Sequence, residues 1–435
     1  MEKKKMRYIE CLFIIIALIC MSSGCIVDDM IGDAQGTLFE KVKFDDDSNY
    51  TAVAAEQAVD CEYYKSNGEI THGYDSLNTD KQKECYKAIN EAVYKISEEA
   101  NENNMYPIGK VTVNDGSFSE LDMDVCIKAY LMDNPQVFWI TNRYNYGSAG
   151  NQAIIQLFSY VSGTECQKMI GALNEEINKI MTSIPNNLKE YHLEKYIHNE
   201  VLEKCTYAKG INTAEDGWEE FTVYGALIDG SAVCEGYAHA MCMLLNKVGI
   251  DCYYANGYGE NSPHMWNTVK IDGNWYHLDA TWDDHDNAYF NYFNLNDKQI
   301  QSDHIISEKY EDKKSDESLG EVYNLFLPEC NSDSANYFVV ESTYIYDFEE
   351  SREIMVEDLV NAAKNLDDIF TVKIDNSIDF QDAMDEMFNE DPYYMFDYIK
   401  EANEQLESGH KINDKNASII MLENFNSVVV KLEYN

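Results

Sequence analysis

The chain has 435 residues, enough for two to four domains, and its 33 Lys and Arg against 78 Asp and Glu give a formal net charge of −45 at pH 7. Such an acidic surface repels nucleic-acid phosphates and anionic lipid headgroups. The composition therefore excludes a nucleic-acid-binding protein.

The N-terminal segment has the pattern of an export signal. Basic residues within 3–7 precede an apolar run over 11–21, which is short for a permanent bilayer span. A Ser-Ser-Gly-Cys sequence ending at Cys25 follows, and it resembles the cleavage site of a bacterial lipoprotein. We expect residues 1–25 to be a lipoprotein-type signal peptide, with Cys25 as the lipid attachment site. The protein would then be extracytoplasmic and anchored to the bacterial cell membrane by its N-terminal lipid. Ordinary secretion and a retained membrane anchor are the alternatives.

The next two segments differ in patterning. Residues 26–75 are acidic and weakly patterned, and we interpret them as a spacer. Residues 76–195 are interpreted as an N-terminal α/β domain. Its apolar spacing predicts helices around 86–96 and 169–181, and strands at 137–140 and 154–158.

A cysteine stands at the start of a clearly helical segment. Apolar residues recur at helical spacing from Tyr237 to Val248, Gly249 follows as a stop signal, and a turn-like segment precedes Cys234. In the first helical turn, the positive dipole end and open backbone N–H groups favour a thiolate and can bind a developing oxyanion. Gly236 is expected to leave room for a substrate backbone. Taken alone, a merely buried cysteine is the better interpretation, because structural cysteines outnumber catalytic ones.

A hairpin with a histidine and an aspartate follows this helix. The strand-like runs 264–271 and 274–282 flank Asp272-Gly273, a two-residue turn signal. A two-residue turn places His264 opposite Thr281 and Asp279 opposite Trp266. His264 and Asp279 then share one face as diagonal neighbours, about 7–8 Å apart along the backbone. The other, mostly apolar face is expected to form a core, and a bulge at Gly273 would alter the register.

The rest of the chain is interpreted as a linker and a second small domain. Residues 306–335 are charged and turn-rich, which favours a linker. Residues 336–435 are expected to form a C-terminal α/β domain. Its predicted elements are strands at 337–340, 370–374, 419–422 and 428–432, and helices near 354–363, 380–388 and 394–406.

No cofactor or metal site is indicated by the sequence. The 12 cysteines include no CxxC pair, and there is no HExxH motif. The cysteine spacings show no scaffold pattern, so no specific disulfide is predicted. The polar run 283–286 invites a cation-site interpretation, but a solvated loop is favoured because no ordered ligand spacing follows. His239, His277 and Cys242 are interpreted as structural residues.

The combined motifs resemble the transglutaminase-like superfamily, particularly its bacterial, peptidase-like branch. The resemblance covers roughly residues 190–305, about a quarter of the chain. It rests on Tyr224–Leu227, Ala232–Ala238, His264–Asn267, Trp275–Asp283 and Tyr292–Leu295. It implies an α+β fold in which the cysteine helix packs on an antiparallel sheet, with residues 196–305 as the catalytic domain. It also implies a papain-like triad of Cys234, His264 and Asp279.

Two functions are compatible with this resemblance. The first is an exported cysteine enzyme that cleaves amide bonds through a thioester: Cys234 attacks, His264 moves the proton and Asp279 orients the imidazole. Hydrolysis of peptides or cell-wall peptides is favoured over amine transfer, because water is always available as acceptor. The alternative is a non-catalytic surface module for binding or assembly. The intact trio favours the enzyme, since a scaffold has no need of all three groups.

Overall fold

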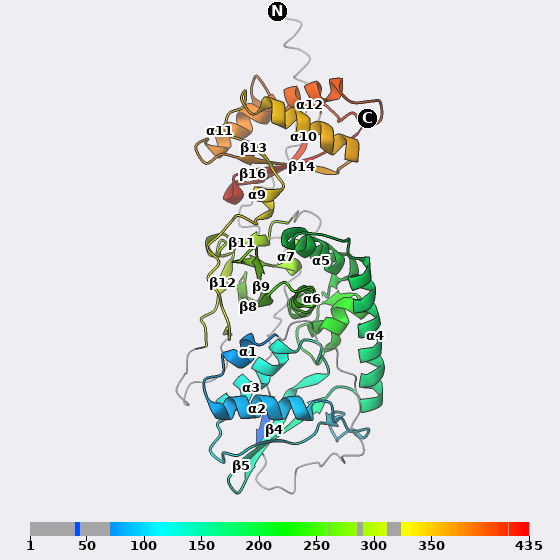
Figure 1. Cartoon of the computed structure of the whole chain (residues 1–435), viewed down its shortest axis with the longest axis vertical. Helices are drawn as coiled ribbons and strands as arrows, with labels where there is room; N and C mark the ends of the chain where they lie inside the picture. Colours follow the sequence, from blue (N-terminus) through cyan, green and yellow to red (C-terminus); the bar gives the residue numbers. More distant parts are fainter. Residues whose placement is uncertain are drawn as a thin grey trace, which may run out of the picture. The chain divides into compact units, whose positions relative to one another are not determined.

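The computed structural model describes residues 40–43, 70–260, 262–284, 290–310, 323–415 and 417–434. These residues form two compact units, one ending at Ser332 and the other beginning at Asp333, which are described separately below (Figure 1). The expected signal peptide and the lipid site Cys25 lie outside the described residues. Of the expected spacer 26–75, only residues 40–43 and 70–75 are described, and they contain a strand and a short helix. Among the described residues, no helix combines the length and the apolar composition of a membrane span.

The unit that ends at Ser332 is of the α+β class, with two five-stranded sheets. Its elements in chain order are β1 (Glu40–Lys43), α1 (His72–Asp75), α2 (Asp80–Ala92), β2 (Tyr106–Pro107), β3 (Val111–Val113), α3 (Glu120–Asp133), β4 (Ile140–Ala149), β5 (Gln152–Ser159), α4 (Gly163–Ser183), α5 (Glu190–Lys204), β6 (Thr206–Tyr207), the 3-10 turn η3 (Glu219–Phe221), the π turn η4 (Gly225–Asp229), β7 (Ser231–Ala232), α6 (Cys234–Lys247), β8 (Cys252–Gly259), β9 (Ser262–Ile271), β10 (Asn274–Leu278), α7 (Ala280–Asp283), β11 (Phe293–Leu295), α8 (Asp297–Ile300) and β12 (His304–Ile306).

The first sheet has the order β1-β4-β5-β2, with β3 also paired to β5. Capping side chains begin its helices earlier than the apolar spacing predicts. Thr79 forms a capping box with Gln82, so α2 starts at Asp80. The predicted strand at 137–140 begins only at Ile140, and the strand at 154–158 lies within β5.

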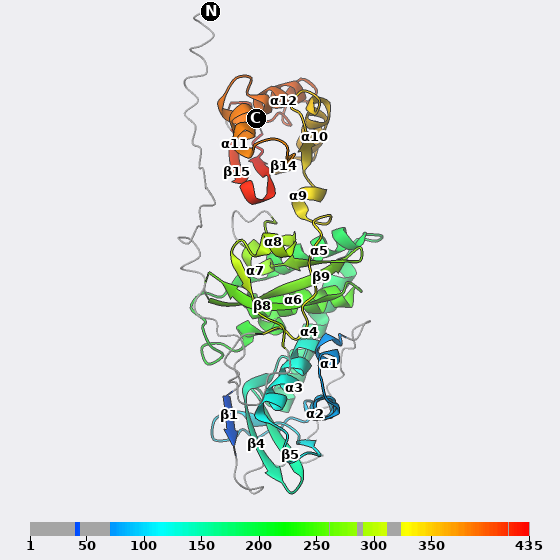
Figure 2. The ribbon, with the colours of Figure 1, turned by 90° about the vertical axis from the view of Figure 1, so that its left-hand side faces the viewer.

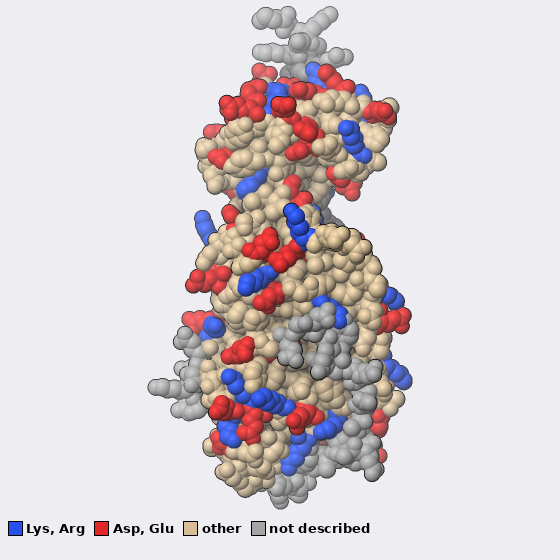
Figure 3. Space-filling model, viewed as in Figure 1, with Lys and Arg blue, Asp and Glu red and all other residues tan. Residues whose placement is uncertain are grey.

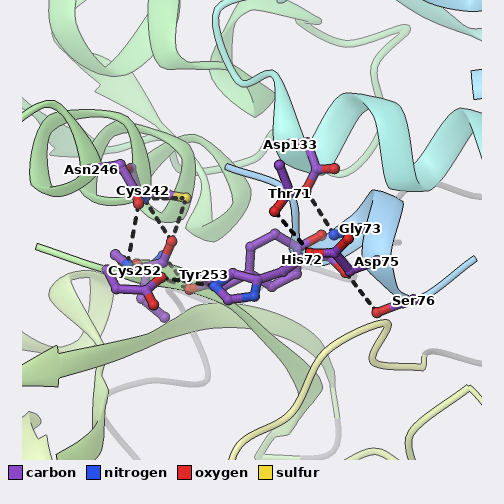
Figure 4. A network of polar contacts seen from close by, with 12 residues as sticks. Thr71, His72, Gly73, Asp75, Ser76, Asp133, Cys242, Asn246, Cys252 and Tyr253 are labelled. Carbon is purple, nitrogen blue, oxygen red and sulfur yellow. Dashed lines mark hydrogen bonds and ion pairs between the residues drawn. The ribbon is translucent and has the colours of Figure 1, made fainter. Parts of the chain in front are cut away.

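Helix α1 is held between α3 and the chain just before β8 by a partly buried polar network (Figure 4). Both carboxylate oxygens of Asp133, at the end of α3, accept backbone N–H groups of α1, each at 2.8 Å. On the other side, His72 Nε2 lies 2.8 Å from Asp251 Oδ1, next to β8, and its ring stacks on Phe326 at 4.0 Å. The two domains predicted as 76–195 and 196–305 therefore lie within one compact unit.

The second sheet has the order β11-β10-β9-β8-β12 and is antiparallel throughout. Helix α6 packs against β8 and β9, as the views in Figures 1 and 2 show. In the hairpin of β9 and β10, Ile271 faces Asn274 and Leu278 faces Asn267, which is the register predicted from a two-residue turn. Positive φ angles of 48° at Asp272 and 85° at Gly273 are those of a type I′ turn.

The second strand of the hairpin is shorter than predicted. β10 ends at Leu278, and α7 begins at Ala280 because the Asp279 side chain caps it. The expected strand pairs of His264 with Thr281 and of Asp279 with Trp266 are therefore not formed. Both faces of the hairpin are buried, since His264 and Trp266 are as enclosed as the expected core face.

The described residues of the expected linker 306–335 that precede Asp333 are built into this unit. Asn324 is fully buried and lies at the edge of the second sheet. Its Oδ1 accepts the Asn256 N–H at 2.7 Å, and its Nδ2 donates to the carbonyls of Asn256 at 3.0 Å and Ser307 at 2.7 Å. The polar composition of this segment predicts a linker. In the structure, its polar side chain Asn324 forms hydrogen bonds with backbone groups of β8 and of the chain after β12.

The unit that begins at Asp333 has its own hydrophobic core and one four-stranded sheet of order β13-β14-β16-β15. Acidic side chains outnumber basic ones on the face shown in Figure 3. Its elements are α9 (Tyr337–Val340), β13 (Thr343–Ile345), α10 (Arg352–Asn365), β14 (Ile369–Ile374), α11 (Phe380–Met384), the π turn η5 (Asp385–Asn389), α12 (Tyr394–Glu404), β15 (Ser418–Leu422), the 3-10 turn η6 (Glu423–Phe425) and β16 (Ser427–Lys431).

Most predicted elements of this unit are present, with one error and one omission. Residues 337–340 form the helical turn α9 and not a strand, because the Asn336 side chain caps them by accepting the Phe338 N–H at 3.1 Å. Strand β13 was not predicted from the sequence. It pairs in parallel with β14, a strand more than twenty residues further along the chain. This pairing depends on the tertiary fold and leaves no local sequence pattern.

Candidate active site

Cys234 is the first residue of α6, as the sequence predicts. The preceding residue, Val233, is extended and its N–H donates to the Glu220 carbonyl at 2.9 Å. No side chain caps this end of the helix, so its first-turn N–H groups point to where a ligand oxygen could bind. Cys234 itself is 5% exposed. The thiol therefore lies in an enclosed site beside open backbone donors.

Gly236 has a different role from the expected one. A Cβ at this position would lie 2.6 Å from the Glu220 carbonyl oxygen and 2.7 Å from the Ala232 Cβ. The space beside Gly236 is thus filled by the chain's own η3 turn and β7. The expectation that it accommodates a substrate backbone is wrong, because tertiary packing already occupies that space.

His264 and Asp279 meet as predicted, though by a different backbone route. His264 Nε2 lies 2.6 Å from Asp279 Oδ2, and the two residues are 5% and 1% exposed. The second oxygen, Oδ1, accepts the backbone N–H groups of Thr281 at 3.0 Å and Trp282 at 3.2 Å. The cap of α7 therefore fixes the carboxylate, and the carboxylate fixes the imidazole. Because Nε2 of His264 contacts Asp279, Nδ1 is the ring nitrogen that can take a proton from the thiol.

Charge and burial act in opposite directions on this pair. Burial disfavours the charged form of His264, but the Asp279 charge, the Cys234 charge and hydrogen bonds to both side chains together raise its pKa to about 10. Burial also disfavours the Asp279 carboxylate, yet His264 and His304 hold the pKa of Asp279 well below its usual range. The Cys234 side chain therefore lies within interaction range of the His264 ring. The three predicted residues come together at one point.

A second histidine, which the sequence analysis missed, contacts the same carboxylate. His304 is 2% exposed and is the first residue of β12, the edge strand paired with β8. Its Nε2 lies 3.1 Å from Asp279 Oδ2, and its Nδ1 lies 2.6 Å from Asp303 Oδ1. The only signal in the sequence is the adjacent Asp303-His304 pair, because the pairing of β12 with β8 is not visible in a local pattern.

Aromatic rings enclose the imidazoles. Trp266 stacks on His264 with 5.8 Å between ring centroids and 19° between planes. Trp282 lies 4.2 Å from the His304 ring. Gly259 makes room for these rings, since a Cβ there would be 2.8 Å from Trp282 Cζ2 and 3.5 Å from His264 Cγ. The walls of the site are therefore apolar and keep water away from the ion pairs.

Tyr207 is a further polar side chain near the thiol. It lies on β6 opposite Ala232, two residues before Cys234. Burial, followed by the charges of Cys234 and Asp279, raises the pKa of Tyr207 well above its usual range. The neutral phenol is half-buried within electrostatic reach of both groups and can donate a hydrogen bond.

A cavity of about 340 Å³ lies next to the residues that follow Cys234 and His264 in the chain. Glu235 and Met265 line it together with Trp218, which stacks on Tyr160 with 4.7 Å between centroids. Lys128 also lines it; its amine donates to the Tyr323 carbonyl at 3.0 Å, and burial lowers the pKa of Lys128 to about 8. The cavity offers mostly apolar and aromatic walls with a few charged groups, as ligand pockets do.

Asp283 differs from the solvated loop expected for 283–286. It is 5% exposed, accepts the Tyr292 N–H at 3.0 Å and lies 3.2 Å from His198 Nε2. His285 and Asp286 lie outside the described residues. Asp284, which follows α7 in the sequence, accepts a hydrogen bond from the Tyr237 hydroxyl. Both described aspartates are structural, joining α7 to α5 and α6.

Within the part of the chain that the structure describes, two groups of side chains have donor atoms within 4.8 Å of one another, close enough to share a metal ion. The first is the carboxylate with its two imidazoles, whose atoms are already joined by hydrogen bonds. The second contains His277, Asp297 and Cys330. There, Trp266 Nε1 donates to His277 Nδ1 at 3.0 Å, so the ring proton is on Nε2, which lies 2.9 Å from Asp297 Oδ1. That tautomer has no lone pair facing Asp297 and does not fit a metal ligand.

A comparison with protein families identifies the same part of the chain that carries the site. The model of the transglutaminase-like superfamily matches residues 178–280. No match was found among curated proteins.

Among solved structures, one described as a TGase is 16% identical, with a TM-score of 0.24 and coverage of 34% of this chain and 46% of that one. A candidate cysteine protease from Cytophaga hutchinsonii is 15% identical, with a TM-score of 0.22 and coverage of 31% and 55%. The periplasmic domain of TgpA from Pseudomonas aeruginosa is 17% identical, with a TM-score of 0.20 and coverage of 30% and 55%. The chain thus spans about half the length of these structures.

Proposed function

Because residues 178–280 match the model of the transglutaminase-like superfamily, we propose that this chain is a member of it and a cysteine-dependent enzyme that acts on amide bonds through a thioester intermediate. The single observation that carries the proposal is the buried contact of 2.6 Å between His264 and Asp279, with the Cys234 thiol at the start of α6 interacting with the same imidazole. A thiol, a base and an orienting carboxylate are the groups that acyl transfer requires.

The chemical steps follow from the positions of these groups. His264 holds the thiol proton at Nδ1, and the Cys234 thiolate attacks the amide carbonyl carbon. The developing oxyanion is bound by the open N–H groups at the start of α6, with the Tyr207 hydroxyl as the candidate second donor. The imidazolium then protonates the leaving amine as the C–N bond breaks. Water, deprotonated by His264, cleaves the thioester and restores the thiol.

We favour hydrolysis of a peptide, with cell-wall peptide as a candidate substrate and amine transfer as the alternative second step. The cavity beside Glu235 and Met265 supports a bound side chain or peptide segment, since its apolar walls adjoin the residues that follow the nucleophile and the base. The N-terminal pattern ending at Cys25 supports an extracytoplasmic, lipid-anchored protein that would meet such substrates.

A glutamine-containing peptide incubated with the protein and a labelled primary amine distinguishes the reactions. Peptide cleavage or ammonia release indicates hydrolysis, and incorporation of the label indicates transfer. Cys234→Ser is the matched control and is expected to abolish either product. A panel of peptides and cell-wall fragments that yields no product, together with a slow unselective reaction of Cys234 with alkylating agents, would favour the non-catalytic binding module instead.

A further inference from the structure

Asp279 accepts hydrogen bonds from two imidazoles, although the proposed reaction uses one. His264 Nε2 lies 2.6 Å and His304 Nε2 3.1 Å from the same oxygen, Oδ2. The three side chains are at most 2% exposed, and the two rings are 5.3 Å apart between centroids. His304 therefore shares the acceptor on which the orientation of His264 depends.

The second nitrogen of His304 determines the charge of its ring. Nδ1 lies 2.6 Å from Asp303 Oδ1, and the other oxygen of Asp303 accepts the Tyr292 hydroxyl at 2.8 Å. A carboxylate accepts hydrogen bonds, and an imidazole nitrogen donates only when it carries a proton. Both nitrogens of His304 face carboxylates, and only a ring with a proton on each nitrogen can donate to both of them. The Asp303 side chain is 35% exposed.

We propose that His304 is a cationic positioning residue: it holds Asp279 in place and offsets part of its charge, so that His264 can release its proton to the leaving group. This inference rests on the proposed function. A buried carboxylate that stabilises the imidazolium also raises its pKa, and this lowers the driving force for transfer of the proton to the leaving group. A second cation close to His264 opposes this, because like charges at short distance disfavour each other.

The other titratable groups around the rings come from different elements. Cys234 interacts with His264 from α6, and Tyr207 on β6 lies within electrostatic range of Cys234 and Asp279. His277 on β10 is separated from His264 by Trp266, and Asp283 lies at the end of α7. These groups remain unchanged in the variants below, so a difference between variants reports on His304 and its counter-ion.

The test is the pH dependence of Cys234 alkylation by iodoacetamide, measured residue by residue with mass spectrometry. In His304→Gln, loss of a cation 5.3 Å from His264 is expected to move the acid limb of the profile upward by about one to two pH units, and alkylation on that limb slows at least about tenfold. Asp303→Asn keeps the donor to Asp279 but lets Nδ1 lose its proton, so a smaller shift in the same direction is expected. Asp297→Asn, beside His277, is the matched control and should leave the limb in place.

An acid limb unchanged in both variants, with a uniform slowing at all pH values, would overturn the proposal and leave His304 a structural residue. If His304→Gln does not fold, Asp303→Asn decides alone. Histidine-labelled NMR of the full chain adds a readout independent of catalysis. Two protonated ring nitrogens on His304 near pH 7.5 support the inference, and a neutral ring contradicts it. A wild-type Cys234 no more reactive than the other thiols would instead refute the proposed function.

Discussion

Replacement of Asp279 by Asn tests the electrostatic account of the triad with little change in shape. The amide oxygen can still accept the N–H groups of Thr281 and Trp282, so the cap of α7 is retained. The amide nitrogen of the new side chain would, however, face His264 Nε2. The amide N–H and an Nε2–H would then both be hydrogen-bond donors with no acceptor between them. The ring is expected to place its proton on Nδ1, toward the sulfur, where it can no longer accept the thiol proton.

The magnitude follows from the pKa of His264, which is raised from 6.5 to about 10, with Asp279 the larger favourable cause and Cys234 the second. If Asp279 supplies roughly two of these units, its charge stabilises the thiolate–imidazolium pair by about 2.7 kcal/mol. Alkylation of Cys234 at pH 6 should therefore be about a hundredfold slower in Asp279→Asn than in the wild type. A rate within threefold of the wild type, in a folded variant, would refute this reasoning.

Three further predictions concern other parts of the site. Tyr207→Phe should lower the turnover of amide substrates about tenfold or more but leave alkylation unchanged, since alkylation develops no oxyanion; equal effects on both would contradict the assignment. Gly257→Ala places a Cβ 2.0 Å from the Ile305 carbonyl oxygen and should destabilise the protein by about 3 kcal/mol in denaturant unfolding. The control is Gly171→Ala in α4, where an added Cβ has no atom within 4 Å and the unfolding free energy should be unchanged or higher. His264, whose folded pKa of about 10 exceeds its unfolded 6.5, contributes stability that is complete below pH 6.5 and lost as the pH rises through 10. Wild type should therefore lose a few kcal/mol of unfolding free energy between pH 7 and 10, and His264→Gln should not show this decline.

Local patterns were sufficient where one short segment determines the structure. The Asp272-Gly273 turn sets the register of β9 and β10, because a two-residue turn with positive φ angles allows one pairing. The apolar spacing after Cys234 and the stop at Gly249 give the bounds of α6 nearly to the residue. Together with the resemblance to a known family, these features brought the thiol, the imidazole and the carboxylate into one predicted site.

Errors arose where a side chain or a distant strand decides the outcome. Asp279 ends β10 because its carboxylate caps α7, which strand alternation does not reveal. Asn324 is polar because it pairs with backbone at a sheet edge, a role that local composition cannot distinguish from that of a linker. His304 reaches Asp279 only through the pairing of β12 with β8. Gly236 likewise accommodates distant parts of the chain and not a ligand.

The most direct test of the central claim is the reaction of iodoacetamide with each thiol near pH 7. The eight cysteines of the described residues are buried, so burial alone predicts slow reaction at all of them. If His264 activates the sulfur at the start of α6, Cys234 should be alkylated at least about a hundredfold faster than the others, and His264→Ala should remove that advantage. Equal, slow labelling of all the thiols, or a Cys234 rate that survives the loss of His264, would contradict the account.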